Sequence, residues 1–242
     1  MTHWLDRGAD GWRLDAAYSV PSDFWARVLP AVRARHPRVW FLGEVIHGDY
    51  ADFVARSTVD SVTQYELWKA IWSSLKDRNF FELDWALQRH TAFLRDFRPN
   101  TFIGNHDVTR IASTVGADLT PLALTILLTV GGIPSVYYGD ERGFAGVKEQ
   151  RLGGDDAVRP AYPDSPADLP RNETWRMHAD LIGLRRSNPW LGGAVTQPVE
   201  LTNTRYVYRV SDGRRHLDVE LDLDGPTAIV RGDDGGTRWR YG

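Results

Sequence analysis

The chain has 242 residues, 42% of them hydrophobic and 25% charged, and a net charge of −3, which gives no reason to expect nucleic acid or a membrane surface as a partner. The absence of cysteine excludes disulfides, zinc–thiolate sites, iron–sulfur clusters and a thiol nucleophile. Because no apolar stretch is long enough to cross a bilayer and no disulfide can form, we expect a cytoplasmic location, with secretion of a full-length parent left open.

Strand and helix patterns alternate along the chain up to residue 187. Apolar runs predict strands at residues 10–15, 38–45, 59–63, 101–105 and 133–138. Helical spacing of apolar residues predicts helices at 21–35, 50–56, 66–76, 82–95, 121–130 and 171–186. Strands that alternate with helices pair in parallel through right-handed crossovers. The loop at 139–170, rich in Gly, Asp and Pro, is of a kind that often carries function in a barrel.

The pattern changes after residue 187. Short strands are predicted at 195–200, 205–210, 216–223, 227–230 and 237–241, separated by turn sequences such as Asp-Gly. We therefore expect a catalytic domain at residues 1–187, built as part of an α/β barrel, and a small antiparallel β domain at residues 188–242.

Three of the predicted parallel strands end in a carboxylate. The first ends at Asp15, the second carries Glu44 near its end, and Asp107 follows the strand at 101–105. Acidic residues at the carboxyl ends of successive parallel strands are how an α/β barrel builds an active site. The pattern predicts an enzyme that handles a positively charged transition state.

The first of these strands also carries an arginine. Because side chains alternate across a strand, Arg13 and Asp15 share one face, the barrel interior, while Trp12 and Leu14 face the helix layer as core packing. A buried Arg13 would keep the Asp15 carboxylate ionised and oriented, as a nucleophile requires. A purely structural Arg–Asp pair is the alternative.

The other two carboxylates allow more than one interpretation. With little polar support around it, Glu44 could act as a general acid, although a glutamate at a strand end is often a solvated loop residue or a cap. Asn105, His106 and Asp107 could bind sugar hydroxyls, or form a structural hydrogen bond or half of a metal site. No other ligand stands at metal-binding spacing nearby, so no metal residue is assigned.

Together, the three carboxylates suit the oxocarbenium-like transition state of glycoside cleavage. The segments 10–17, 42–45, 102–107 and 132–141 resemble, in order and spacing, the fourth-, fifth-, seventh- and eighth-strand motifs of the α-amylase family of retaining glycoside hydrolases. The resemblance implies Asp15 as the nucleophile with Arg13 as its partner, Glu44 as the acid/base, Asp107 as the transition-state stabiliser and His106 as a ligand of a sugar hydroxyl.

The departures from the family pattern concern specificity and metal binding. Tyr18-Ser19 stands where many amylases carry Lys-His, so Tyr18 and His47 are candidate substrate contacts in place of that pair. A packed loop residue is the alternative for each. The family's third-strand motif, which often supplies a calcium ligand, is not found here. We therefore expect no cofactor, with calcium possible in a full-length protein but no site assignable in this chain.

The number of parallel strands is the last observation. Five are predicted, whereas a closed barrel needs eight, so we expect strands four to eight of a TIM (β/α)8 barrel and an amino-terminally truncated chain. Such a chain would fold poorly or self-associate through its open edge. The implied activity is retaining hydrolysis of α-glucosidic bonds in starch, maltodextrins or small α-glucosides. A glucanotransferase, a disaccharide isomerase and an inactive fragment are the alternatives.

Overall fold

The computed structural model describes residues 1–169 and 171–242. Position 170, the last residue of the predicted loop 139–170, lies outside the described residues. The elements of the parallel part are, in chain order, α1 (Thr2–Leu5), β1 (Gly11–Leu14), α2 (Ser22–Arg33), β2 (Trp40–Gly43), α3 (Tyr50–Ser57), β3 (Ser61–Val62), α4 (Tyr65–Lys76), α5 (Phe81–Phe93), β4 (Asn100–Thr101), α6 (Ile111–Val115), α7 (Thr120–Thr129), β5 (Ile133–Pro134) and α8 (Glu173–Ser187).

The parallel strands form one row in chain order. β1, β2 and β3 make one parallel sheet and β4 and β5 another, and a parallel bridge from Thr63 to Asn100 joins the two. Strand order equal to chain order, with helical crossovers, is the arrangement of a barrel wall. β1 and β5 lie at the two ends of this row.

All five of these strands are shorter than the sequence predicts, among them β4 and β5. β4 covers Asn100–Thr101 and β5 covers Ile133–Pro134, whereas apolar runs predicted 101–105 and 133–138. The strand pairing ends at Thr101, and the chain turns at Asn105, whose side chain accepts a hydrogen bond from the backbone N–H of Asp107 (2.9 Å). The apolar residues Phe102 and Ile103 are still buried. The apolar pattern therefore predicted their burial correctly but not the end of strand pairing.

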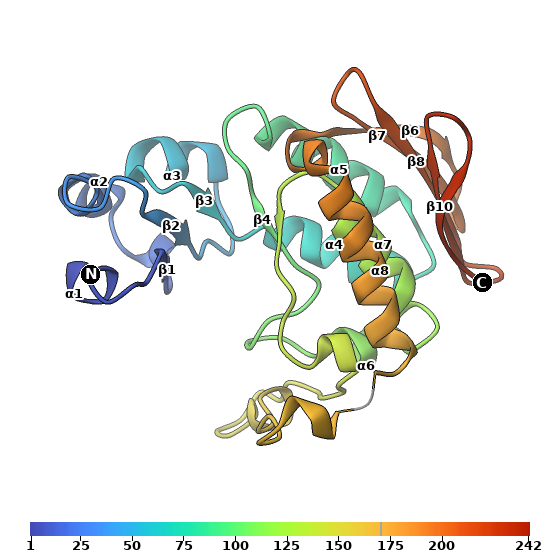
Figure 1. The fold of residues 1–242 in the computed structure, drawn as a ribbon, viewed down its shortest axis with the longest axis horizontal. Helices are drawn as coiled ribbons and strands as arrows, with labels where there is room; N and C mark the ends of the chain where they lie inside the picture. Colours follow the sequence, from blue (N-terminus) through green and yellow to red (C-terminus); the bar gives the residue numbers. More distant parts are fainter. Residues whose placement is uncertain (170) are drawn as a thin grey trace.

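The amino-terminal part forms a lobe with its own core (Figure 1). Trp25, Leu29 and Val32 recur at helical spacing along α2 and are buried, as expected of a helix that covers a sheet. They pack with residues of the first three strands, among them Leu14 and Phe41. Trp12 packs against the same cluster, which agrees with its predicted place in the core.

The second core lies between the helices α4, α5, α7 and α8 and the carboxyl-terminal sheet (Figure 1). All ten residues of α7 are buried, which agrees with its largely apolar sequence. The sheet contains β6 (Val195–Leu201), β7 (Arg205–Ser211), β8 (His216–Asp222), β9 (Thr227–Gly232) and β10 (Thr237–Tyr241). These strands pair antiparallel in the order β10-β9-β8-β7-β6, which confirms the predicted antiparallel strands.

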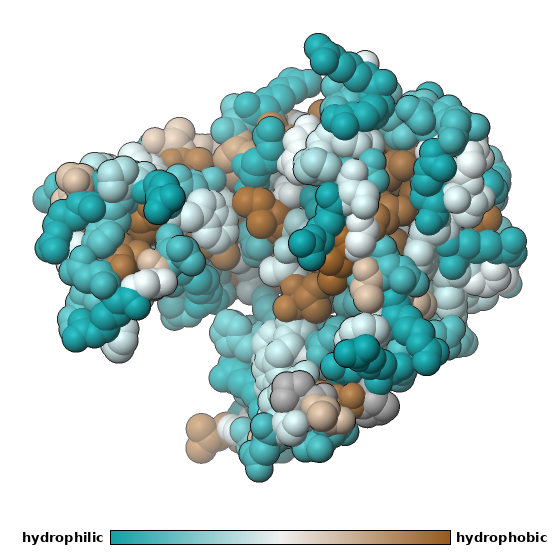
Figure 2. All heavy atoms as spheres, in the orientation of Figure 1, coloured by the Kyte–Doolittle hydropathy of each residue, from teal (hydrophilic) through white to brown (hydrophobic). Residues whose placement is uncertain are grey.

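The surface also exposes apolar groups. Figure 2 shows apolar side chains in the middle of the face seen in Figure 1. Among the exposed large apolar residues are Ile133 and Val136, in β5 and just after it, at one end of the strand row. No helix in the described part of the chain is both long enough and apolar enough to cross a membrane.

Candidate active site

Asp15 stands directly after β1, where the strand ends. Its side chain is 81% exposed, while Leu14 before it is buried. The next residue, Ala16, adopts a left-handed conformation (φ 41°, ψ 40°), which costs a non-glycine residue about 1–2 kcal/mol. This turn ends the strand abruptly and leaves the carboxylate free on the surface of the site.

Glu44 occupies the equivalent position on the neighbouring strand. Leu14 pairs with Gly43 in the β1–β2 register, and the backbone N–H of Glu44 donates to the carbonyl oxygen of Leu14 (2.9 Å). Asp15 and Glu44 therefore leave the sheet at the same level from adjacent strands. Unlike Asp15, Glu44 is only 5% exposed.

Arg13 joins the two carboxylates. Its Nη1 contacts Oδ1 of Asp15, and its Nη2 lies 2.7 Å from Oε1 of Glu44. A planar guanidinium can hold two carboxylates in fixed relative positions, which a lysine ammonium cannot. The prediction that Arg13 is buried is wrong, since its side chain is 33% exposed. β1 lies at the end of the strand row, so the face that carries Arg13 is open.

Glu44 has two further hydrogen-bond donors. The backbone N–H of Ala16 donates to its Oε2 (2.7 Å), and the Tyr65 hydroxyl donates to its Oε1 (3.4 Å). Burial and the nearby Glu44 charge raise the pKa of Tyr65 to about 12, so this hydroxyl keeps its proton at neutral pH. The expectation that Glu44 has little polar support is therefore wrong, because a strand-end pattern does not show which loops return to it.

Asp107 is connected to this pair through Asn105 of its own loop and Tyr65 of α4. Asn105 donates from Nδ2 to the Tyr65 hydroxyl oxygen (2.9 Å) and accepts from the Asp107 backbone N–H (2.9 Å). A continuous hydrogen-bonded path thus runs from Glu44 through Tyr65 and Asn105 to Asp107. The His106 ring lies beside the carboxylate, with Nε2 3.2 Å from Oδ2 of Asp107.

Arg159 is a site residue that the sequence reasoning missed. Its Nη2 donates to Oδ1 of Asp107 (2.9 Å), and its Nε donates to the His106 carbonyl oxygen (2.8 Å). The same guanidinium contacts Asp155 (2.8 Å). Only its place in the predicted functional loop 139–170 pointed to it.

Tyr18 and His47, the two further residues predicted to contact substrate, lie next to each other. Their ring centroids are 5.3 Å apart, and the Tyr18 backbone N–H donates to the carbonyl oxygen of Glu44 (3.4 Å). The Tyr18 side chain is exposed. The two rings thus form a small aromatic surface beside the turn that carries Glu44.

A buried ion pair fixes the Asp107 loop from behind. Arg110 and Asp140 are almost inaccessible to solvent, and Nη1 of Arg110 lies 2.8 Å from Oδ1 of Asp140. Arg110 also donates to the carbonyl oxygens of Tyr138 and Val158. Gly104 is required here because an added Cβ would stand 2.6 Å from Oδ2 of Asp140. The loops after β4 and β5 are therefore tied to each other.

The structure brings Asp15, Arg13 and Glu44 into direct contact and connects Asp107 to them through Tyr65 and Asn105. In the described residues, no three His, Asp or Glu side chains are arranged as a metal site. The individual roles implied for these residues stay predictions.

Known proteins with similar sequences belong to one group of enzymes. A family model described as alpha amylase, catalytic domain, matches residues 1–205. A cyclomaltodextrin glucanotransferase from Bacillus licheniformis is 29% identical over 242 residues, covering 94% of this chain and 32% of the relative. A cyclomaltodextrinase from Geobacillus thermopakistaniensis is 30% identical over 239 residues, covering 95% of this chain and 39% of the relative.

Solved structures show a similar fold. The cyclic alpha-maltosyl-(1→6)-maltose hydrolase from Arthrobacter globiformis superposes with a TM-score of 0.81 at 22% identity, covering 99% of this chain and 57% of that one. The alpha-amylase from H. orenii superposes with a TM-score of 0.75 at 21% identity, covering 91% of this chain and 52% of that one. The chain thus spans about a third of these curated relatives and somewhat over half of these solved structures.

Proposed function

Because this chain belongs to the family of alpha-amylase catalytic domains, we propose that it cleaves α-glucosidic bonds of starch, maltodextrins or small α-glucosides with retention of configuration. The observation that carries the proposal is the contact of Arg13 with both Asp15 and Glu44. It holds an exposed carboxylate and a buried one side by side at adjacent strand ends. A retaining glycosidase needs two carboxyl groups about 5 Å apart.

In the first step, Asp15 attacks the anomeric carbon while the bond to the leaving oxygen breaks. Glu44 gives its proton to that oxygen, and the sugar stays on Asp15 as a glycosyl ester. In the second step, Glu44 removes a proton from water, the water oxygen bonds to the anomeric carbon, and the Asp15 carboxylate is released. The sugar leaves with its original anomeric configuration because the carbon is inverted twice.

The remaining site residues support these steps. Arg13 holds the attacking carboxylate, and its charge would stabilise Asp15 again as it leaves. Asp107 would stabilise the positive charge that develops on the sugar ring, with His106 binding a hydroxyl of the same ring. Arg159 fixes the position of the Asp107 carboxylate. Tyr18 and His47 would contact the sugar on the leaving-group side, since they flank the turn of Glu44.

The reaction as proposed uses carboxylates alone and needs no cofactor. We further propose that the five parallel strands are strands four to eight of a (β/α)8 barrel, since they follow one another in a single row. The outer edges of β1 and β5 would then pair with three more strands in a closed barrel. A chain with both edges open would self-associate through them, and sedimentation at several concentrations tests this.

The experiment that tests the function is product analysis with β-cyclodextrin, maltotriose and soluble starch, together with proton NMR of the first anomer released. Asp15→Asn and Glu44→Gln should each lower kcat about a hundred- to ten-thousandfold. Asp10→Asn, directly before β1, is the matched control and should be active. Normal activity in Asp15→Asn, or release of the inverted anomer, would contradict the proposal.

Transfer in place of hydrolysis is the second candidate. The relative from Bacillus licheniformis is a glucanotransferase by name, and the same glycosyl ester would react with a sugar hydroxyl if an acceptor displaced water. In this second candidate, such an acceptor would bind against the aromatic surface of Tyr18 and His47, whose ring centroids are 5.3 Å apart. Products longer than maltotriose, formed from maltotriose, would assign transfer, and glucose with maltose as the only products would assign hydrolysis.

A further inference from the structure

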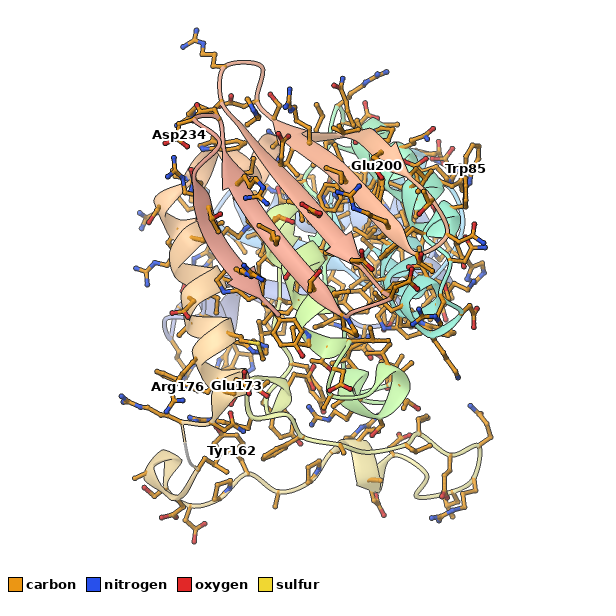
Figure 3. The ribbon with its side chains drawn as sticks, turned by 90° about the vertical axis from the view of Figure 1, so that its right-hand side faces the viewer. Trp85, Tyr162, Glu173, Arg176, Glu200 and Asp234 are labelled. Atoms are coloured by element: carbon orange, nitrogen blue, oxygen red, sulfur yellow. The ribbon has the colours of Figure 1, made fainter. Side chains whose placement is uncertain are left out.

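A groove between α4 and α5 exposes a tryptophan that no part of the proposed reaction uses. The groove has a volume of about 470 Å³, and Trp85 on α5 is 63% exposed. Figure 3 shows its side chain projecting from the surface of the protein. Exposure of a whole indole is unfavourable in water, and contiguous apolar surface in a hollow is typical of a binding site.

The sequence of α5 places this residue on the outside. Leu83, Ala86 and Leu87 form the buried face of the helix, whereas Phe81 and Trp85, four residues apart, lie exposed on the opposite face. An ordinary amphipathic helix carries polar residues there. The buried apolar face of α5 thus packs on the core, and Trp85 does not take part in this packing.

The polar groups around the indole are fixed in place. Glu66 accepts two hydrogen bonds from Arg89, at 2.8 and 3.0 Å, and Glu82 contacts Lys69. All four side chains line the groove. Charged groups held by one partner still offer further donors and acceptors to a ligand. An aromatic face beside such groups can stack on a sugar ring and bind its hydroxyls.

The charges also select the class of ligand. The groove carries two carboxylates and two cations, so it has no net formal charge. It does not attract a polyanion such as nucleic acid or an anionic membrane, and it suits a neutral polyhydroxylated chain. Trp68 lies on the wall, stacked on Phe102 at a centroid distance of 6.2 Å.

The groove reaches the candidate active site. Tyr65, which donates to Glu44, lines it, and so does the exposed Ile46, two residues after Glu44. We propose that this groove is a second binding site for a neutral α-glucan chain, with the Trp85 indole as its stacking surface. That the ligand is an α-glucan rests on the proposed function, whereas its being a neutral sugar chain is argued from the exposed indole and the paired charges of the groove.

Affinity electrophoresis in gels that contain amylopectin tests this proposal, with the full chain in its Glu44→Gln form to prevent hydrolysis. Replacement Trp85→Ala should raise the dissociation constant about tenfold, the effect of losing one aromatic stacking contact. Trp85→Tyr should restore most of the retardation. Trp4→Ala is the matched control, since Trp4 is 57% exposed on α1, far along the chain from the groove.

The results separate this inference from the proposed function. Retardation that depends on Trp85, together with an absence of glycosidase activity in the unmodified chain, would support the groove and contradict the function. An active chain with the same retardation before and after Trp85→Ala would overturn the groove. Equal retardation by a cellulose derivative would support a sugar-chain site but overturn its assignment to α-glucans. If Trp85→Ala instead dissociates an oligomer in sedimentation, the face is a protein interface and the proposal is wrong.

Discussion

Nη2 of Arg13 lies 2.7 Å from Oε1 of Glu44, a residue of the neighbouring strand end. The other nitrogen of the same fork contacts Asp15. This contact sets the distance between the two carboxylates that the proposed mechanism uses. Because the sheet register places Leu14 opposite Gly43, even a one-residue shift in strand pairing would separate the carboxylates and move them to different levels.

The first prediction concerns this fork. Arg13→Lys keeps the charge but cannot contact both carboxylates in a fixed plane, so we expect kcat to fall roughly a hundredfold with little change in KM. The melting temperature should hardly change because the side chain is partly exposed. Arg35→Lys, in a surface pair with Asp6, is the control. An unchanged kcat in Arg13→Lys would show that charge alone suffices.

The second prediction concerns the hydroxyl of Tyr65. Tyr65→Phe removes the contacts to Glu44 and Asn105 but keeps the ring, which packs against Phe102 at a centroid distance of 4.9 Å. We expect a roughly tenfold lower kcat, the loss of one hydrogen bond to a charged group, and a normal circular dichroism spectrum. A kcat equal to that of the unmodified chain would mean that the path from Glu44 to Asp107 has no role in catalysis.

The third prediction concerns Arg159 and the loop that carries it. Arg159→Gln removes the contacts to Asp107 and to the His106 carbonyl, so the Asp107 carboxylate loses its fixed position. We expect kcat/KM on maltotriose to fall about tenfold or more. Arg214→Gln, in the turn between β7 and β8, provides a matched control that should behave as the unmodified chain. Full activity in Arg159→Gln would show that Asp107 is positioned by its own loop alone.

Residue pattern was sufficient to find the strand-end carboxylates but not their surroundings. Asp15 and Glu44 lie at the ends of apolar runs whose parallel pairing is confirmed. These strands could be predicted because the side chains of a buried strand are themselves apolar. The partners of Glu44 come from elsewhere: Ala16 lies 28 residues away and Tyr65 lies 21 residues away. Arg159 lies 52 residues from Asp107, across a loop without periodicity. Such contacts depend on tertiary folding.

The carboxyl-terminal sheet was predicted more accurately than the parallel strands. In β7, Tyr206, Tyr208 and Val210 alternate with less buried residues, and turn residues mark the strand ends. The start and end of each strand can therefore be predicted from its own sequence. β4 and β5 carry no such signal. The apolar residues Phe102 and Ile103 beyond β4 are buried without pairing, whereas Val136 beyond β5 is exposed. The predicted burial of Arg13 failed for a related reason, since exposure depends on neighbouring strands rather than on the strand itself.

The last prediction concerns stability at acid pH and a histidine within the second core. His90 is fully buried on α5, and its Nε2 lies 3.0 Å from the carbonyl oxygen of Gly131. Burial lowers the pKa of His90 from 6.5 to about 4. Between these two values the unfolded chain binds a proton that the folded chain does not. The free energy of unfolding should therefore decrease as pH falls from 6.5 towards 4, by up to about 3 kcal/mol from this residue.

Urea unfolding at pH 7 and pH 5 measures this effect. His90→Gln removes the titrating group, so the variant should lose less stability between the two pH values than the unmodified chain, even if it is less stable at pH 7 because the contact to Gly131 is altered. His3→Gln, at an exposed position on α1, should keep the original pH dependence. An equal loss of stability in His90→Gln and the unmodified chain would mean that His90 binds its proton equally well folded and unfolded, and another group would then have to account for the acid sensitivity.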